Sequence, residues 1–240
     1  MGAARGQTPM RSHRAFVAKL EPVITLTGRE FDHLRVLRAN IGDHVTVFDG
    51  AGLEADSQII STDEMSITLE LGEIRAVTLE PPQAITLAIG LLKADKLYDV
   101  VRACTELGVN KFQLLITEFS DAKEIGSQKL ERLRRVALEA AKQCRRSVVP
   151  DILEPIKLIH LEPGLGSIVA HPGSGIRARE VVTWDSPVTV ITGPEGGFSS
   201  REIELLESRG VTRVGLGPRI LRAETAPNAL IAALTAAENL

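Results

Sequence analysis

The chain has 240 residues, 44% hydrophobic and 25% charged, so it can bury a sizeable core and has the composition of a globular protein. No apolar run approaches the ~20 residues of a membrane span, and residues 1–14 lack the apolar region of a secretory signal, so we expect a cytoplasmic protein with no membrane partner and a loose segment over residues 1–10. The net charge of −3 argues against a protein that coats nucleic acid with its whole surface.

Residues 15–75 contain short alternating segments separated by turn formers, a pattern that predicts a small β-barrel. One helix interrupts the strands, because Phe31, Leu34 and Leu37 recur at helical spacing. Glu80-Pro81-Pro82-Gln83 has the composition of a linker, so we predict a first domain over 1–78 and a second over 79–240. The strands predicted in the first domain are 15–18, 45–48, 56–60 and 66–69.

After the linker, apolar strand patterns alternate with helical ones, and this alternation predicts a parallel α/β sheet. Ile85 to Leu92 is continuously apolar, as expected for a strand buried on both faces. Gly108 is placed to end the helix that follows. The predicted strands are 85–92, 112–116, 168–170, 188–192 and 211–216, and the predicted helices are 97–107, 128–146, 202–208 and 228–238.

The two cysteines, Cys104 and Cys144, fall on predicted helices beside apolar neighbours. We therefore expect both thiols to be reduced and buried, since a buried cysteine behaves as a small hydrophobic residue. No Cys or Cys/His cluster has the spacing of a zinc site, so no metal is expected.

The segment Gly193-Pro194-Glu195-Gly196-Gly197 directly follows the predicted strand 188–192, at the edge where open α/β sheets bind ligands. Its glycines would let the backbone approach a ligand closely. Ser199 and Glu202 have the spacing of a capping box for the next helix. A glutamate in so tight a loop points to a binding role, although an ordinary Gly/Pro turn explains the glycines equally well.

A second segment, residues 216–227 (LGPRILRAETAP), follows the strand 211–216 and leads into the last helix. Pro227 fits a helix there only in its first turn. Arg222 and Glu224 lie among apolar residues at a strand end, where charges are costly unless they are paired or in use. The two residues therefore form either a structural ion pair or part of a site.

Basic residues gather in two regions, residues 1–40 and residues 129–146. In the second region the basic residues are Lys129, Arg132, Arg134, Arg135, Lys142, Arg145 and Arg146, against Glu131 and Glu139. Such a local surface is what phosphate contact requires. Charge alone, however, favours the simpler interpretation of a solvated helix face.

Together, residues 193–197 and 216–226 resemble the C-terminal signature of the bacterial 16S rRNA uridine-N3 methyltransferases, the RsmE family within the SPOUT class. Residues 105–109 (TELGV) and 139–150 (EAAKQCRRSVVP) are similar to further segments of that family. Residues 33–38 (HLRVLR), with Gly42-Asp43 and Phe48-Asp49-Gly50, resemble its RNA-binding domain. The resemblance covers nearly the whole chain from about Arg14.

The resemblance implies a PUA-like β-barrel followed by a SPOUT α/β domain with a deep trefoil knot, assembled as a homodimer. It also implies S-adenosyl-L-methionine (SAM) as cofactor and 16S rRNA in the small ribosomal subunit as partner, without a metal. Carried onto this sequence, the SAM-binding residues are His171, Gly193, Pro194, Glu195, Gly196, Gly197, Leu216, Gly217, Leu221 and Arg222.

The implied reaction methylates uridine N3, which carries a proton at neutral pH and becomes nucleophilic only when the proton is removed. Arg222 is the candidate to stabilise the resulting anion, because a guanidinium stays charged and offers fixed donors. Glu224 is the candidate base, or it orients Arg222. The residues expected to contact RNA are His33, Arg35 and Arg38 of the first domain and Arg145 and Arg146 of the second.

One departure from the family pattern lies at Thr117-Glu118-Phe119-Ser120-Asp121, where family members usually have an arginine. If that arginine handles RNA, its role here is missing or moved. Two alternatives therefore stay open: a SPOUT ribose 2′-O-methyltransferase that acts on tRNA or another RNA, and a non-catalytic RNA-binding assembly protein. A nucleotide-dependent metabolic enzyme is not supported, because the sequence has neither a P-loop nor a true dinucleotide fingerprint.

Overall fold

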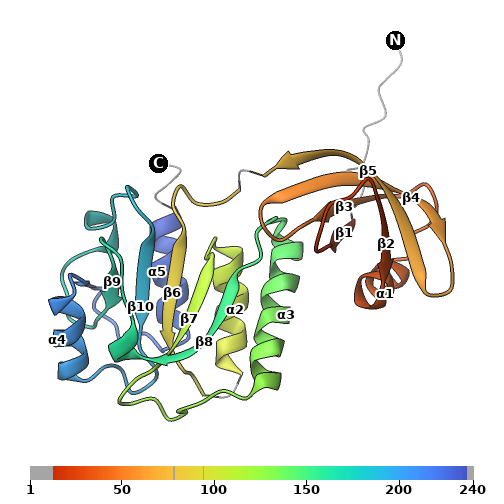
Figure 1. Cartoon of the computed structure of the whole chain (residues 1–240). Helices are drawn as coiled ribbons and strands as arrows, with labels where there is room; N and C mark the ends of the chain where they lie inside the picture. Colours follow the sequence, from red (N-terminus) through yellow and green to blue (C-terminus); the bar gives the residue numbers. More distant parts are fainter. Residues whose placement is uncertain (1–12, 78, 94, 237–240) are drawn as a thin grey trace. The chain divides into compact units, whose positions relative to one another are not determined.

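The computed structural model describes residues 13–77, 79–93 and 95–236, so the loose segment expected over residues 1–10 lies outside the described part. The chain divides into two compact units, residues 1–78 and residues 79–240 (Figure 1). Each unit has its own cluster of buried apolar side chains, and each is described here by itself.

The first unit is built on a five-stranded sheet with the order β1-β3-β4-β5-β2. β1 pairs with β3 in parallel, and the other pairs are antiparallel. Helix α1 (Gly28–Val36) buries Phe31 and Leu34 against the sheet, as their spacing predicts, whereas Leu37 lies beyond the helix and is exposed. The strands are β1 (His13–Phe16), β2 (Val23–Thr27), β3 (His44–Phe48), β4 (Leu53–Thr62) and β5 (Ser66–Ala76).

The second unit contains a six-stranded sheet with the order β11-β9-β10-β6-β7-β8. Every pairing in this sheet is parallel, which confirms the α/β architecture predicted from the alternation of strands and helices. The strands are β6 (Ile85–Gly90), β7 (Lys111–Ile116), β8 (Asp151–Lys157), β9 (Ile168–Ala170), β10 (Val188–Thr192) and β11 (Thr212–Val214).

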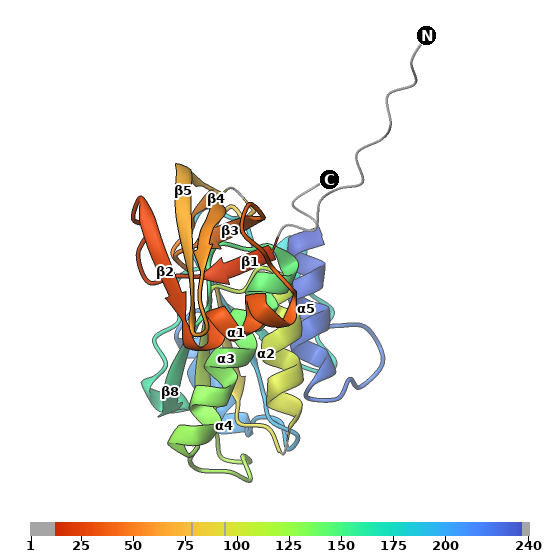
Figure 2. The same cartoon turned by 90° about the vertical axis from the view of Figure 1, so that its right-hand side faces the viewer.

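Helices cover both faces of this sheet (Figures 1 and 2). Ile85, Leu87 and Ile89 of β6 pack with α2, α3 and α5, whereas Ala88 packs on the opposite face with α4. Because side chains alternate between the faces of a strand, a strand covered on both sides is apolar throughout. The helices are α2 (Lys96–Glu106), α3 (Ser127–Cys144), α4 (Ser200–Ser208) and α5 (Thr225–Thr235), with short 3-10 helices η1 (Leu158–His160) and η2 (Ala178–Glu180).

Two strands, β2 and β8, were not predicted from the sequence. Both are edge strands, which need no continuous apolar run, and β8 contains Pro155, a residue tolerated mainly at sheet edges. Helix α3 ends at Cys144, earlier than predicted, because Arg145 adopts a left-handed conformation with φ of 67°. Helix α2 ends before Gly108, whose φ of 97° confirms its predicted role.

Candidate functional site

Three loops meet at the carboxyl edge of the parallel sheet. The strand order places β11, β9 and β10 side by side, so the segments that follow these strands leave the sheet at adjacent positions. They form a pocket of about 350 Å³, a size typical of small-molecule sites. The expected cofactor residues that line it are His171, Gly193, Pro194, Glu195, Gly197, Leu216, Gly217 and Leu221.

Two of the expected cofactor residues do not line this pocket. Gly196 faces Phe119 instead, and a β-carbon at Gly196 would lie only 2.7 Å from that of Phe119, so glycine is required there. The departure from the family pattern therefore packs directly against the glycine loop. Arg222 lies between the lining residues Leu221 and Ala223, but its side chain is 83% exposed and stands in solvent.

The loop after β10 is held by the start of helix α4. The Ser199 hydroxyl accepts from the Glu202 backbone N–H, and the Glu202 carboxylate accepts from the Ser199 N–H, which confirms the predicted capping box. Glu202 also accepts from the backbone N–H of Glu118, 84 residues away in sequence. The capping box thus anchors both the glycine loop and the segment after β7.

Lys96, which sequence reasoning missed, joins two of the pocket loops. Its ammonium, at the start of α2, lies 3.1 Å from Oε1 of Glu195 and 3.1 Å from Oε2 of Glu224. The backbone N–H of Lys93 also donates to Glu195. No local pattern could have indicated this role, because Lys96 and Glu195 are 99 residues apart in sequence.

Lys96 and the two carboxylates, Glu195 and Glu224, favour each other's charged forms. Burial raises the pKa of Glu195, but hydrogen bonds from its own backbone N–H and from Lys96 outweigh burial and leave that pKa lowered. The pKa of Glu224 is lowered by its own backbone N–H and, less strongly, by Lys96. The two carboxylates, Glu224 first, raise the pKa of Lys96. Glu224 is therefore ionised at neutral pH, with Nη1 of Arg222 3.9 Å from its carboxylate.

We expect Lys96→Met to lower the melting temperature clearly at neutral pH and less in acid. Because the pKa values of Glu195 and Glu224 are lowered, their contribution to stability is present above the ordinary glutamate pKa of about 4.3 and is lost as pH falls through the folded-state values. Thermal unfolding across this range should show wild type and variant converging below about pH 4.

The matched control for this prediction is Lys93→Met. The Lys93 ammonium pairs with Asp121 on the surface, where ion pairs contribute little, and its backbone N–H to Glu195 survives the substitution. This variant should follow wild type at every pH. A Lys96→Met deficit of constant size from neutral to acid pH would contradict the role given to the two carboxylates.

The pocket also contains a buried hydroxyl that has no hydrogen-bond partner among the described residues. Thr192, the last residue of β10, lines the pocket, and its Oγ1 is buried without a hydrogen-bond partner among the described residues. A buried polar atom left unpaired costs free energy, so a ligand that pairs with it is favoured. Phe198 and Leu221 add apolar lining beside it.

The RNA-contact residues expected in the first unit come from α1 and the turn after it. Arg35 and Arg38 are exposed, and His33 is half-buried. Arg35 pairs with Asp32 and lies over the ring of Phe31, 5.5 Å from its centroid. Two exposed guanidinium groups on this surface suit phosphate contact.

Arg145 and Arg146 have opposite environments. Arg145 is exposed, whereas Arg146 is only 3% exposed. The guanidinium of Arg146 pairs with Glu80 and donates to the carbonyls of Thr105, at 2.6 Å, and Val109, at 2.9 Å. The structure therefore corrects the expectation that Arg146 contacts RNA, because its donors are already used inside the second unit.

The cysteines have no chemical role in this pocket. Cys104 is buried, its thiol donates to Oδ1 of Asn228 at 3.2 Å, and burial raises its pKa. Cys144 is also a free thiol, but it is only partly buried, less than expected. Within the described ranges, no group of His, Cys, Asp and Glu side chains could hold a metal ion, and no helix has both the length and the apolar character to cross a bilayer.

Comparison with known proteins places both units in one family. A model of the RNA methyltransferase domain matches residues 79–235, and a model of the RNA methyltransferase PUA domain matches residues 26–72. Ribosomal RNA small subunit methyltransferase E of Synechocystis sp. is 35% identical over 227 residues, which cover 90% of this chain and 74% of that protein. The protein of the same name from Bacillus subtilis is 32% identical over 89% of this chain and 90% of its own length.

Solved structures agree with the sequence matches. Ribosomal RNA small subunit methyltransferase E from Neisseria gonorrhoeae, solved with bound SAM, has a TM-score of 0.88 at 25% identity and covers 95% of this chain and 98% of its own. A Legionella pneumophila protein in complex with SAM has a TM-score of 0.85 at 28% identity and the same coverage. The fold is a PUA-like domain followed by a SPOUT-type methyltransferase domain, and the chain belongs to the ribosomal RNA small subunit methyltransferase E family.

Proposed function

We propose that this chain transfers a methyl group from SAM to N3 of a specific uridine in 16S rRNA of the small ribosomal subunit. The observation that carries the proposal is the pocket built from the loops after three adjacent parallel strands, in a chain of this family. The relatives that match over most of their length are named ribosomal RNA small subunit methyltransferases, and two similar structures hold SAM. An enzyme with this substrate acts in the cytoplasm, where ribosomes are assembled.

The residues of the pocket suit SAM. Gly193 and Gly197 leave the backbone of the loop open to close approach by a ligand. Among the described residues the Thr192 hydroxyl has no hydrogen-bond partner, which a polar cofactor can supply, and Phe198 and Leu221 offer apolar contact for a purine ring. The bound cofactor supplies the methyl group from a sulfonium centre, which is reactive without assistance from a metal.

The chain's own residues then have to activate the uridine. Arg222 has room to turn toward the substrate, since its side chain is mostly in solvent, and its guanidinium can stabilise the negative charge that develops when N3 loses its proton. Glu224 is ionised, so it can accept that proton or orient Arg222 from 3.9 Å. Lys96 keeps Glu224 beside the glycine loop in either case.

We also propose that the C-terminal segment forms the trefoil knot of the class and that the enzyme is a homodimer. In support of a knot, the loop after β9 packs tightly on the end of β11: the Ser174 hydroxyl donates to the carbonyl of Arg213 and the Gly215 N–H donates to that of Ile176. Sedimentation equilibrium tests the dimer, since the expected mass is twice the 25.9 kDa of the chain.

The deciding experiment is methyl transfer from labelled SAM to small ribosomal subunits that lack their native modification, with the product nucleoside identified by mass spectrometry. We expect 3-methyluridine in small subunits and no label in large subunits, the control substrate. A 2′-O-methyl nucleoside would identify the ribose methyltransferase instead. SAM binding without transfer to either subunit would contradict the assigned RNA substrate, and absence of SAM binding would favour the assembly protein.

A further inference from the structure

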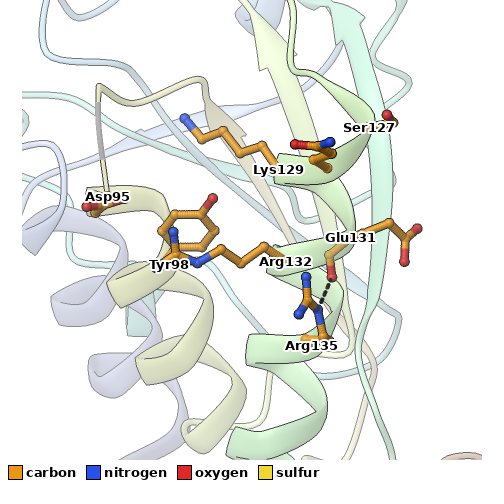
Figure 3. Close-up of a pocket in the computed structure, with 8 residues that line it drawn as sticks. Asp95, Tyr98, Ser127, Lys129, Glu131, Arg132 and Arg135 are labelled. Atoms are coloured by element: carbon orange, nitrogen blue, oxygen red, sulfur yellow. Dashed lines mark hydrogen bonds between the residues drawn. The ribbon is translucent and has the colours of Figure 1, made fainter.

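The basic residues of the segment 129–146, in α3 and just after it, have different environments that the sequence could not show. Lys142 and Arg146, at the end of the segment, are buried and form ion pairs within the second unit. Lys129, Arg132 and Arg135, nearer its start, line a cavity between α2 and α3 (Figure 3). This second group is placed to meet a ligand in the cavity, while Arg134 and Arg145 are exposed outside it.

This cavity has a volume of about 680 Å³, and a second one of about 750 Å³ continues from it along the same two helices. Arg132 and Arg135 line both cavities, so the two form one continuous depression, which we call the α2–α3 groove. Tyr98 lines its α2 side, and Lys129 lines its α3 side. The lining residues run from Asp95 to Glu106 and from Ser127 to Gln143, so the groove follows both helices for most of their length.

The cations of the groove are available to an anionic ligand. No carboxylate pairs with Lys129, Arg132 or Arg135 in the part of the chain that the structure describes. Four acids also line the two cavities. Glu131 pairs with Arg134 and Glu139 pairs with Lys142, whereas Asp95 and Glu106 form no ion pair among the described residues. Arg135 uses only its Nε, which donates to the backbone carbonyl of Glu131 at 3.4 Å. Three positive side chains therefore stand together with most of their donors unused.

Arg132 is held in position for such a ligand. Its guanidinium lies over the ring of Tyr98, 4.3 Å from the centroid, and Figure 3 shows the side chain reaching across the groove to that ring. A guanidinium stacked on one face keeps its edge donors free for two oxygens of a phosphate. The stack also lowers the conformational entropy that Arg132 loses on binding.

The groove adjoins the cofactor pocket through the first turn of α2. Asp95 and Tyr98 line the groove, whereas Lys96, between them in sequence, contacts Glu195 and Glu224 at the pocket. A strand lying in the groove therefore has neighbouring nucleotides within reach of the pocket.

We infer that the α2–α3 groove binds the phosphodiester backbone of the RNA substrate through Lys129, Arg132 and Arg135. This inference rests on the proposed function and adds where the methyltransferase unit holds the RNA. A second copy of the chain fits the groove less well: Val136 and Ala140 are the only aliphatic residues among those that line the two cavities, whereas homodimer interfaces are enriched in apolar area and depleted in lysine and glutamate.

The test is the salt dependence of binding to unmethylated small subunits, measured without SAM, for wild type, Arg132→Ala, Arg135→Ala and Arg179→Ala. Each groove variant should bind severalfold more weakly, with the slope of log affinity against log salt reduced by about one. Arg179→Ala is the control, because it removes the same charge from an exposed residue of the same unit, on η2, that lines neither cavity of the groove. SAM affinity and kcat at saturating subunits should stay at wild-type values in the groove variants.

Each other outcome has a distinct meaning. Slopes for Arg132→Ala and Arg135→Ala equal to that of Arg179→Ala would refute RNA binding by the groove. In that case, wild-type binding and methyl transfer would still support the proposed function. A groove variant that dissociates in sedimentation equilibrium and keeps its salt slope would show that the occupant is a second copy. If the wild-type protein bound neither subunit, both the proposed function and RNA binding by the groove would be refuted.

Discussion

Arg222→Ala should lower kcat for methyl transfer by about 10²–10³-fold, the loss seen when one donor to a developing anion is removed. The position of Arg222 is the basis for this expectation. Arg222 comes directly after the pocket residue Leu221, yet its own side chain is 83% exposed and does not line the pocket. Such a side chain contributes little to the pocket's shape. SAM affinity, measured by calorimetry, should therefore remain within a few-fold of wild type.

Arg222→Lys separates charge from geometry in the same assay. A lysine keeps the positive charge but loses the planar fork of donors, so we expect activity between those of wild type and Arg222→Ala. Because Glu224 lies 3.9 Å from Arg222, Glu224→Gln should also lower kcat and change the acid limb of the pH–rate profile if it accepts the proton. Near-normal turnover of Arg222→Ala would refute its assignment to catalysis.

Arg146→Met should destabilise the second unit by about 3–5 kcal/mol, the cost of removing one partner of a buried ion pair. The guanidinium of Arg146 joins the linker residue Glu80 to the carbonyls of Thr105 and Val109 around the end of α2. Its loss removes one donor from the Thr105 carbonyl, which still accepts from the Gly108 N–H, takes the side-chain donor from the Val109 carbonyl, and leaves the Glu80 carboxylate without its cation. Urea unfolding, followed by circular dichroism, measures the change in the midpoint.

Arg145→Met is the matched control, since Arg145 is the exposed neighbour and loses the same charge. Its unfolding midpoint should stay close to that of wild type. If Arg146→Met unfolded like wild type but bound small subunits with a reduced salt slope, the original expectation of an RNA contact would be right and the structural role wrong.

Much of the second unit could be predicted from the sequence because its signals are local. The apolar strands β6 and β10, covered on both faces, and the glycine loop after β10 each occupy one continuous segment. The edge strands β2 and β8 could not be predicted, because an edge strand needs neither a continuous apolar run nor strict alternation. The capping box of α4 was predictable for the same local reason, since its two residues are three apart.

The sequence by itself determined the family resemblance, the order of the helices and of the strands other than β2 and β8, and the two loops expected to bind the cofactor, since each of these signals lies in contiguous residues. Only the tertiary structure decided which of these residues meet. The strand order β11-β9-β10 brings His171 to the same pocket as Gly193 and Leu216. Packing of α2 places Lys96 between two distant carboxylates, and packing of the linker buries Arg146. The contacts of Lys96 and Arg146 join residues 66 to 128 positions apart, a separation at which periodicity and motif spacing carry no information.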